Sequence, residues 1–173
     1  GNIMRNPTYI LAIVITFGFL GSGAHAQNKE AWLLSCADKN KAETCRMSQS
    51  QQASKMVDGK PQMLGRLLAV TVLYVLEPKS KKRVPNMTIQ LPMGVDLRAG
   101  TVIQIDKNKE FTLPYLRCTN MGCDVSMKLT KKLIRSILSG NQLRVGFRAW
   151  GSNKTNVVTA SLSGFTKIFR RLK

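Results

Sequence analysis

The sequence predicts an all-β protein, a two-sheet antiparallel β-sandwich with one short helix and room for a second helix at the C-terminus. Short apolar segments rich in β-branched residues recur between clusters of Gly, Pro, Asn and Asp, and roughly eight of them have the pattern of strands. Strands and helices do not alternate in the way that builds a parallel sheet, and no internal repeat occurs. Antiparallel strands of this kind pack as a sandwich, with a small closed barrel as the alternative.

Most of the predicted strands are short and bounded by turn residues. The first two, at 31–36 and 45–49, are joined by a polar turn and predict a hairpin. Residues 49–60 are polar and predict a loop that ends in the Asp58-Gly59 turn. The very apolar run 66–76 predicts a central strand because of its β-branched content. The remaining strands are predicted at 87–91, 101–106, 142–150 and 155–162, and two extended segments, 111–118 and 123–129, flank a turn that contains Gly122.

Two segments have the apolar spacing of an amphipathic helix. In the segment 131–139 this spacing predicts a short helix, with Thr130 as its N-cap and Gly140 at its end. Near the C-terminus, apolar residues recur every three or four positions and allow a second helix that docks by its apolar side. These residues are Phe165, Ile168, Phe169 and Leu172.

The first 26 residues have the three-part pattern of a cleavable secretion signal. Arg5 supplies a positive charge, residues 9–20 are almost wholly apolar, and Ala24-His25-Ala26 provides the small residues that signal peptidase accepts. The alternative, a membrane anchor, fits less well, because the apolar run is about a dozen residues and a spanning helix needs roughly 20. Residues 1–3 have the character of an expression remnant or an upstream extension. We expect cleavage after Ala26, a single domain over 27–173, and a location in the periplasm, in the outer cell envelope or outside the cell.

Four cysteines follow the predicted signal, and an even number in an exported chain predicts disulfides. Of the three pairings, Cys36–Cys45 with Cys118–Cys123 is favoured, because each pair is close in sequence and can close a turn. In the chain-entropy description each short loop contributes about 2–3 kcal/mol. A zinc site is the weaker alternative, because neither spacing is Cys-x2-Cys.

The chain is strongly basic. It has 27 Lys and Arg against 9 Asp and Glu, a formal charge of +18, and removal of Arg5 with the signal leaves 26 against 9, or +17. A field of this sign speeds encounter with anionic partners but does not determine the fold. The expected partners belong to a host surface or to the bacterial envelope: lipopolysaccharide, anionic phospholipid, and sulfated or sialylated glycans. Nucleic acid is disfavoured, because aromatic residues make up only 6% of the chain and export removes the usual target.

Histidine occurs once, as His25 in the predicted signal. The predicted mature protein therefore has no histidine for a Ser-His-Asp or Cys-His nucleophile system, for a general base or for a metal site. The nine acidic residues are scattered, and neither a phosphate-binding glycine loop nor a dinucleotide motif is present. We expect no catalytic residues, no metal site, no cofactor and no enzymatic activity.

Two clusters of basic residues are candidates for anion binding. One lies in a predicted loop bounded by Pro78 and Pro85, and the other lies on the polar side of the predicted helix 131–139. An ordinary solvated surface is the simpler interpretation of both clusters. The candidates are Lys79, Lys81, Lys82 and Arg83 in the loop, and Lys131, Lys132 and Arg135 on the helix.

Four motifs occur in order along the chain: Trp32…Cys36…Cys45-x-x-x-Gln49, Leu91-Pro92-Met93-Gly94-Val95-x-Leu97, Cys118-x-x-x-Gly122-Cys123 and Ser161-Leu162-x-Gly164-Phe165. Taken together, they resemble the invasion-associated locus B family of exported bacterial proteins. The resemblance covers most of the chain and implies an immunoglobulin-like β-sandwich, export, and a part in the invasion of host cells, notably red blood cells. It implies no enzymatic activity and carries over no ligand-binding residue, so we interpret the motifs as structural.

Two hypotheses about function follow. The first is a non-enzymatic, virulence-associated protein that promotes adhesion to or invasion of host cells, erythrocytes in particular, through basic loops that bind anionic partners, with a host protein receptor as a further candidate. The alternative is a periplasmic chaperone-like or envelope-maintenance protein that adds a partner strand at an exposed sheet edge. Salt-sensitive retention on acidic glycans would favour the first. Recovery of envelope clients from the periplasm would favour the second.

Overall fold

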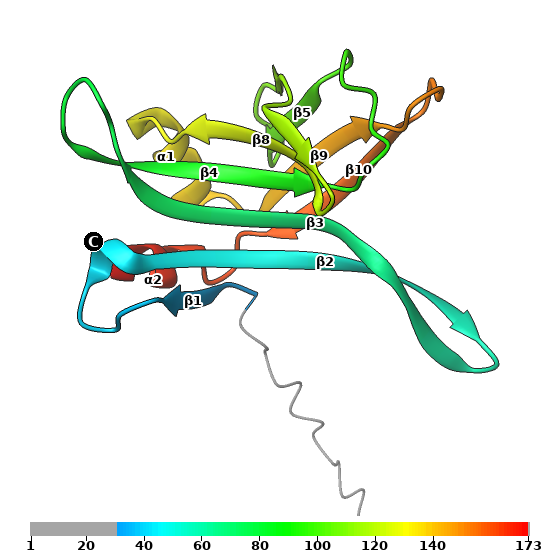
Figure 1. Ribbon diagram of the computed structural model, residues 1–173, viewed down its shortest axis with the longest axis horizontal. Coiled ribbons are helices and arrows are strands. Elements are labelled where there is room, and N and C mark those ends of the chain that lie inside the picture. The colour runs from blue at the N-terminus through cyan, green and yellow to red at the C-terminus, as the bar shows by residue number, and fades with distance from the viewer. Residues whose placement is uncertain (1–30, 173) are drawn as a thin grey trace, which may run out of the picture.

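The computed structural model describes residues 31–172, which fold into two antiparallel β-sheets packed face to face (Figure 1). The six-stranded sheet has the order β1-β2-β3-β4-β8-β7, and the four-stranded sheet has the order β10-β9-β5-β6. The predicted sandwich is therefore confirmed, whereas the predicted secretion signal lies outside the described residues. The strands are β1 (Leu33–Cys36), β2 (Cys45–Val57), β3 (Lys60–Leu76), β4 (Arg83–Leu91), β5 (Thr101–Ile105), β6 (Phe111–Leu113), β7 (Arg117–Thr119), β8 (Gly122–Lys128), β9 (Gln142–Arg148) and β10 (Thr155–Ser161).

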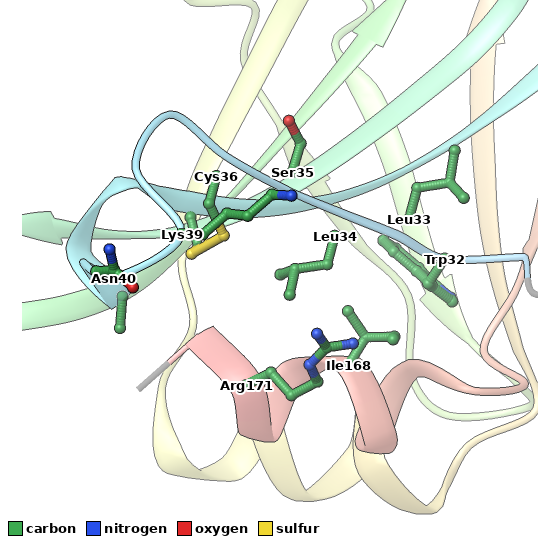
Figure 2. Close-up of a pocket in the computed structure, with 11 residues that line it drawn as sticks. Trp32, Leu33, Leu34, Ser35, Cys36, Lys39, Asn40, Ile168 and Arg171 are labelled. Carbon is green, nitrogen blue, oxygen red and sulfur yellow. A yellow bond between two sulfur atoms is a disulfide. The ribbon is translucent and has the colours of Figure 1, made fainter.

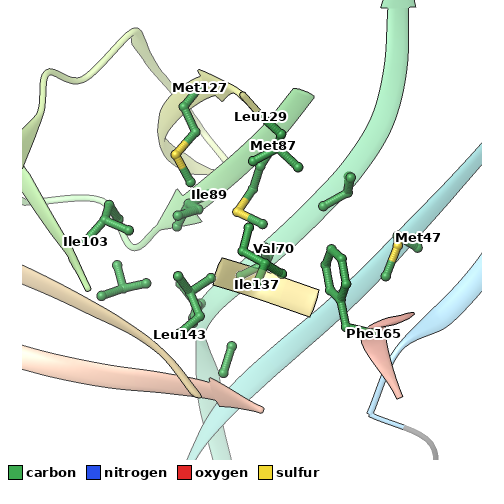
Figure 3. Packing of buried hydrophobic residues seen from close by; sticks show 14 of the residues in the cluster. Met47, Val70, Met87, Ile89, Ile103, Met127, Leu129, Ile137, Leu143 and Phe165 are labelled. Carbon is green, nitrogen blue, oxygen red and sulfur yellow. The ribbon is translucent and has the colours of Figure 1, made fainter. Parts of the chain in front are cut away.

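The core lies between the two sheets and consists of side chains that alternate along the central strands (Figure 3). Alternation arises because successive residues of a strand point to opposite faces of the sheet. Burial of each Val, Ile, Leu or Met side chain contributes about 1.5–3 kcal/mol relative to exposure. The fully buried members include Val70, Val72, Met87 and Ile89 from the six-stranded sheet, and Ile103, Leu143 and Val145 from the four-stranded sheet.

Both predicted helices are confirmed. The helix α1 (Lys131–Ser139) begins after Thr130, whose Oγ1 accepts a hydrogen bond from the backbone N–H of Leu133 at 3.3 Å. The helix α2 (Phe165–Phe169) continues into the 3-10 turn η2 (Arg170–Leu172), and a second 3-10 turn, η1 (Ala42–Thr44), precedes β2. Within residues 31–172 no helix has the length and apolar character that would carry it across a membrane. The predicted docking of the C-terminal helix is also confirmed, because its apolar residues are all buried: Phe165, Ile168, Phe169 and Leu172.

The prediction of a loop at 49–60 is wrong, because β2 and β3 form one long hairpin across this segment. Their pairing runs from Arg46 opposite Leu73 to Val57 opposite Lys60. Only the predicted Asp58-Gly59 turn is confirmed, with φ of 51° at Asp58 and 73° at Gly59. The far half of the hairpin extends beyond the sandwich (Figure 1), so its residues lack the alternation that marks a half-buried strand.

Both favoured disulfides are present. Cys36 lies opposite Cys45 in the β1–β2 pair, and Cys118 lies opposite Cys123 in the β7–β8 pair, so each bond joins directly facing residues. Gly122, beside the second bond, has a φ of 136°, and a Cβ atom there would lie 2.2 Å from the carbonyl oxygen of Leu91. A glycine is therefore required where β8 approaches β4.

The first and last family-like motifs meet across the sandwich. Trp32 Nε1 and Gln49 Nε2 both donate hydrogen bonds to the carbonyl oxygen of Ser161, at 2.8 and 2.9 Å. The N–H of Ser161 donates in return to Gln49 Oε1 at 2.9 Å, and the ring of Trp32 meets that of Phe165 edge-on at 4.9 Å. Because Gln49 is only 5% exposed, these bonds are protected from water and tie the two sheets together. The structural interpretation of these motifs is supported.

Candidate anion-binding surface

The two basic clusters predicted from the sequence lie at the same end of the sandwich. β4 begins at Arg83 and β8 ends at Lys128, and the two strands are antiparallel neighbours, with Asn86 opposite Lys128. The β3–β4 loop and the start of α1 are therefore close, and the N–H of Leu129 donates to the carbonyl of Pro85 at 2.9 Å. Figure 1 shows this loop, α1 and the C-terminus gathered at one end of the long axis. We call this surface the basic end; it comprises residues 77–83 and 128–135.

The β3–β4 loop is held by Glu77, its one acidic residue. The N–H of Glu77 donates to the carbonyl of Lys82 at 2.8 Å, and the N–H of Lys81 donates to the carbonyl of Glu77 at 2.9 Å. The Glu77 carboxylate accepts hydrogen bonds from Lys128 Nζ and Ser80 Oγ, which hold the pKa of that carboxyl below its usual value. Its negative charge is thus matched by Lys128.

The remaining lysines of the loop are available to a partner. Lys79, Lys81 and Lys82 are exposed, and none of them makes an ion pair within residues 31–172. Lys81 sits at the tip with a φ of 57°. The loop therefore presents three unneutralised ammonium groups on a backbone that is fixed by its own hydrogen bonds.

Arg83 differs from its neighbours because its guanidinium group is already hydrogen-bonded to the backbone of the protein. Its Nη2 donates to the carbonyls of Glu43, at 3.1 Å, and Tyr74, at 3.0 Å, and its guanidinium lies 6.0 Å from the Tyr74 ring. These contacts connect the β3–β4 pair to η1. Partial burial raises the pKa of Tyr74, and the charge of Arg83 opposes that rise. Anion binding by Arg83 stays a prediction, with part of its donor capacity already used.

The second cluster occupies the start of α1. Lys131 and Lys132 are exposed in the first turn, and Arg135 follows one turn later on the same side as Lys131. The first turn contains no acidic residue. The N-terminus of a helix already carries partial positive charge, so each cation placed there is unfavourable by about 0.3–1 kcal/mol when exposed. An anion bound at this position would interact favourably with the positive end of the helix dipole and would neutralise the charges of both lysines.

Further cations reach the same end from segments that the sequence-based prediction left out. A hollow of about 750 Å³ separates the β1–β2 hairpin from the C-terminal helix, and its lining includes Lys39 and Arg171 (Figure 2). Leu34 and Ile168 give it apolar walls from opposite sides. Lys39 is not part of a basic cluster in the sequence. Arg171 belongs to the C-terminal segment, whose apolar spacing predicts only a helix that docks on the sandwich. Their proximity depends on how the two ends of the chain fold together.

The exposed groups at the basic end are mainly lysine ammonium groups. Within residues 31–172 no group of three or more His, Cys, Asp or Glu side chains is placed to hold a metal ion. All four cysteines are in disulfides, so no thiol is free. Lysine ammonium groups spread over a loop and a helix end can contact several anionic groups of one extended partner.

The fold and this surface define a basic, disulfide-stapled, antiparallel β-sandwich protein. The profile of the family described as "Invasion associated locus B (IalB) protein" matches residues 32–173. The chain belongs to this family. Membership supports a virulence-associated role in general terms, and the two disulfides are consistent with an exported protein.

Named relatives agree with this assignment. Invasion protein B homologues from Brucella abortus strain 2308 and biovar 1 strain 9-941 are each 22% identical over 153 residues, which cover 88% of this chain and 82% of each relative. The crystal structure of invasion associated protein B from Bartonella henselae superposes with a TM-score of 0.61 at 18% identity, covering 82% of this chain and 91% of that one. The structural likeness shows a shared fold.

Proposed function

We propose that this protein is an exported, non-enzymatic binding protein whose basic end attaches to anionic polymers of a host cell surface or of the bacterial envelope. By this attachment it promotes adhesion to or invasion of host cells, erythrocytes among them. The names of its relatives, as invasion proteins, support this context. The observation that carries the mechanism is the convergence of two lysine clusters, 79–82 and 131–132, at one end of the fold.

The energetics of the basic end support a role beyond solubility. Like charges that lie close together repel, and Lys131 with Lys132 also opposes the dipole of α1. An arrangement that costs stability in the free protein is expected where a partner supplies the missing charge. A sulfated or phosphorylated polymer would supply it, with displaced counterions adding to the affinity at low salt.

The non-enzymatic and exported parts of the proposal rest on composition. The one histidine of the chain, His25, lies in the segment that has the pattern of a secretion signal. Two disulfides stabilise the fold in an oxidising compartment such as the periplasm or the cell exterior.

Retention on immobilised heparin tests the proposal. We compare the wild type with Lys79→Ser/Lys81→Ser/Lys82→Ser and with Lys131→Ser/Lys132→Ser, and leave Arg83 unchanged because it donates hydrogen bonds to two backbone carbonyls. The matched control, Lys55→Ser/Lys60→Ser/Lys154→Ser, removes three exposed charges elsewhere. Both basic-end variants should elute at clearly lower salt than the control. Elution of the control together with the basic-end variants would mean that total charge alone governs retention, and the proposal would be wrong.

A further inference from the structure

The far part of the β2–β3 hairpin is an exposed arm that carries large apolar side chains. We define the arm as residues 54–65, all of which are exposed. Met56, Met63 and Leu64 are 67%, 60% and 57% exposed, and Val57 at the tip is 41% exposed. Side chains of this size in a cluster at the end of a projecting element mark an interaction surface more often than a solvated one.

The pairing of the two strands gives the arm two different faces. Residues that pair directly share a face, and alternate residues along a strand share a face. Met56 pairs with Pro61, and Ser54 pairs with Met63, so one face is largely apolar. The opposite face contains the pairs Val57 with Lys60 and Lys55 with Gln62, and it carries both lysines. The arm is therefore an amphipathic β-ribbon.

The arm is directed away from the rest of the protein. β1 pairs only with residues 45–48 of β2, and β4 pairs only with residues 69–76 of β3, so both edges of the arm are open among the described residues. Two register shifts, at Gln51/Gln52 and Ala53/Ser54, lie at its base, and the second leaves Leu64 as the extra residue of β3. Bulges of this kind bend and twist a ribbon, and Figure 1 shows the hairpin leaving the sandwich at the end opposite to the basic end. The arm can therefore reach a flat surface without hindrance.

We propose that the arm docks on an anionic phospholipid bilayer, with Met56 and Met63 in the boundary between headgroups and acyl chains. Lys55 and Lys60 outnumber Asp58 within the arm, and the charge of +17 after residue 26 attracts the whole molecule to a negative surface. The same charge disfavours a second copy as the occupant, because two such chains repel each other.

The open edges limit how deeply the arm enters. Unpaired backbone N–H and C=O groups are not tolerated in the hydrocarbon layer, so the ribbon lies at the interface rather than across the membrane. The apolar face rests on the bilayer. Lys55 and Lys60 lie on the face turned away from the bilayer. Their four-carbon side chains are long enough for the ammonium groups to extend around the edge of a two-stranded ribbon and contact lipid phosphates.

Flotation with vesicles of equimolar phosphatidylglycerol and phosphatidylcholine tests this proposal. The variant Met56→Ser/Met63→Ser should lower the partition coefficient by at least about tenfold, because two apolar side chains lose their burial. The control Met93→Ser/Met121→Ser removes two methionine side chains that are 62% and 63% exposed outside the arm. It should bind vesicles as the wild type does. Circular dichroism of both variants verifies that each is folded.

A spectroscopic measurement distinguishes docking by the arm from attraction by charge. In the variant Met56→Trp, addition of vesicles should shift the emission maximum of the introduced tryptophan to shorter wavelength. The shift should persist when Lys79, Lys81 and Lys82 are also replaced by serine. That combined variant should lose heparin retention, so this proposal and the proposed function can fail separately. Equal vesicle binding by the two double variants, or an unshifted emission of the indole added at position 56, would overturn the proposal. So would a wild-type dimer that the arm variant converts to monomer in analytical ultracentrifugation without any vesicle binding, since the occupant would then be a second copy.

Discussion

Reversing the two charges in the first turn of α1 should stabilise the protein while it weakens anion binding. The perturbation is Lys131→Glu/Lys132→Glu. Both side chains are exposed, and no acid offsets them in that turn. Most substitutions in a binding surface leave stability unchanged or lower it, so a gain of stability together with a loss of binding is a specific signature of this surface.

The size of the effect follows from the helix dipole. Each exposed lysine in the first turn is unfavourable and each glutamate favourable by about 0.3–1 kcal/mol, so the double reversal should raise the free energy of unfolding by about 1–4 kcal/mol at low ionic strength. For a domain of this size that corresponds to a rise in Tm of about 3–12 °C. Screening at high salt should remove most of the gain.

Urea unfolding followed by circular dichroism, at low and high salt, measures the gain, and heparin chromatography measures the loss. The control is Arg135→Glu, which makes the same kind of charge change in the middle of the same helix. It should alter stability by less than about 0.5 kcal/mol. Destabilisation of the double variant, or an equal gain in the control, would refute the dipole argument. Unchanged heparin retention of the double variant would refute the part assigned to α1.

Three further outcomes are expected. Gln49→Leu should lower the free energy of unfolding by about 2–3 kcal/mol, measured with urea, because the backbone of Ser161 loses two buried hydrogen bonds; a neutral result would show that Gln49 does not tie the sheets together. Gly122→Ala should cost about 3 kcal/mol or more, or abolish soluble expression, since its Cβ would collide with the carbonyl of Leu91; normal stability would contradict the close approach of β8 and β4. The lowered pKa of Glu77 means that its contribution to stability is present above the pKa of an unfolded glutamate and is lost as the pH falls through the folded value. The difference in Tm between the wild type and Glu77→Gln should therefore disappear at acidic pH. A difference that stays constant with pH would argue against the ion pair between Glu77 and Lys128.

The elements that depend on local pattern were predicted well from the sequence. The apolar spacing of α1, its Thr130 cap and the alternation of β9 are short-range signals, and each recurs in the structure. Both disulfides join cysteines that are near in sequence, so proximity along the chain was sufficient to choose between the pairings. The long hairpin was missed, because the far halves of β2 and β3 are solvated on both faces and show no alternation.

The candidate site was predicted only in pieces. Each lysine cluster is visible in the sequence, but their meeting at one end depends on the pairing of β4 with β8, which no local pattern specifies. The addition of Lys39 and Arg171 likewise requires the first hairpin and the C-terminal helix to fold side by side. Arg83 shows the opposite error. Its position in a basic run predicts anion binding, whereas in the structure its guanidinium group donates hydrogen bonds to two backbone carbonyls.

The central claim is that anionic polymers bind at the basic end, and an NMR titration tests it most directly. Backbone amide shifts of the 15N-labelled protein are followed as a heparin oligosaccharide is added. The largest shifts should fall in residues 77–83 and 128–135, should saturate together, and should vanish in Lys79→Ser/Lys81→Ser/Lys82→Ser/Lys131→Ser/Lys132→Ser. Shifts spread evenly over the surface, or concentrated at another site such as the arm, would contradict the account.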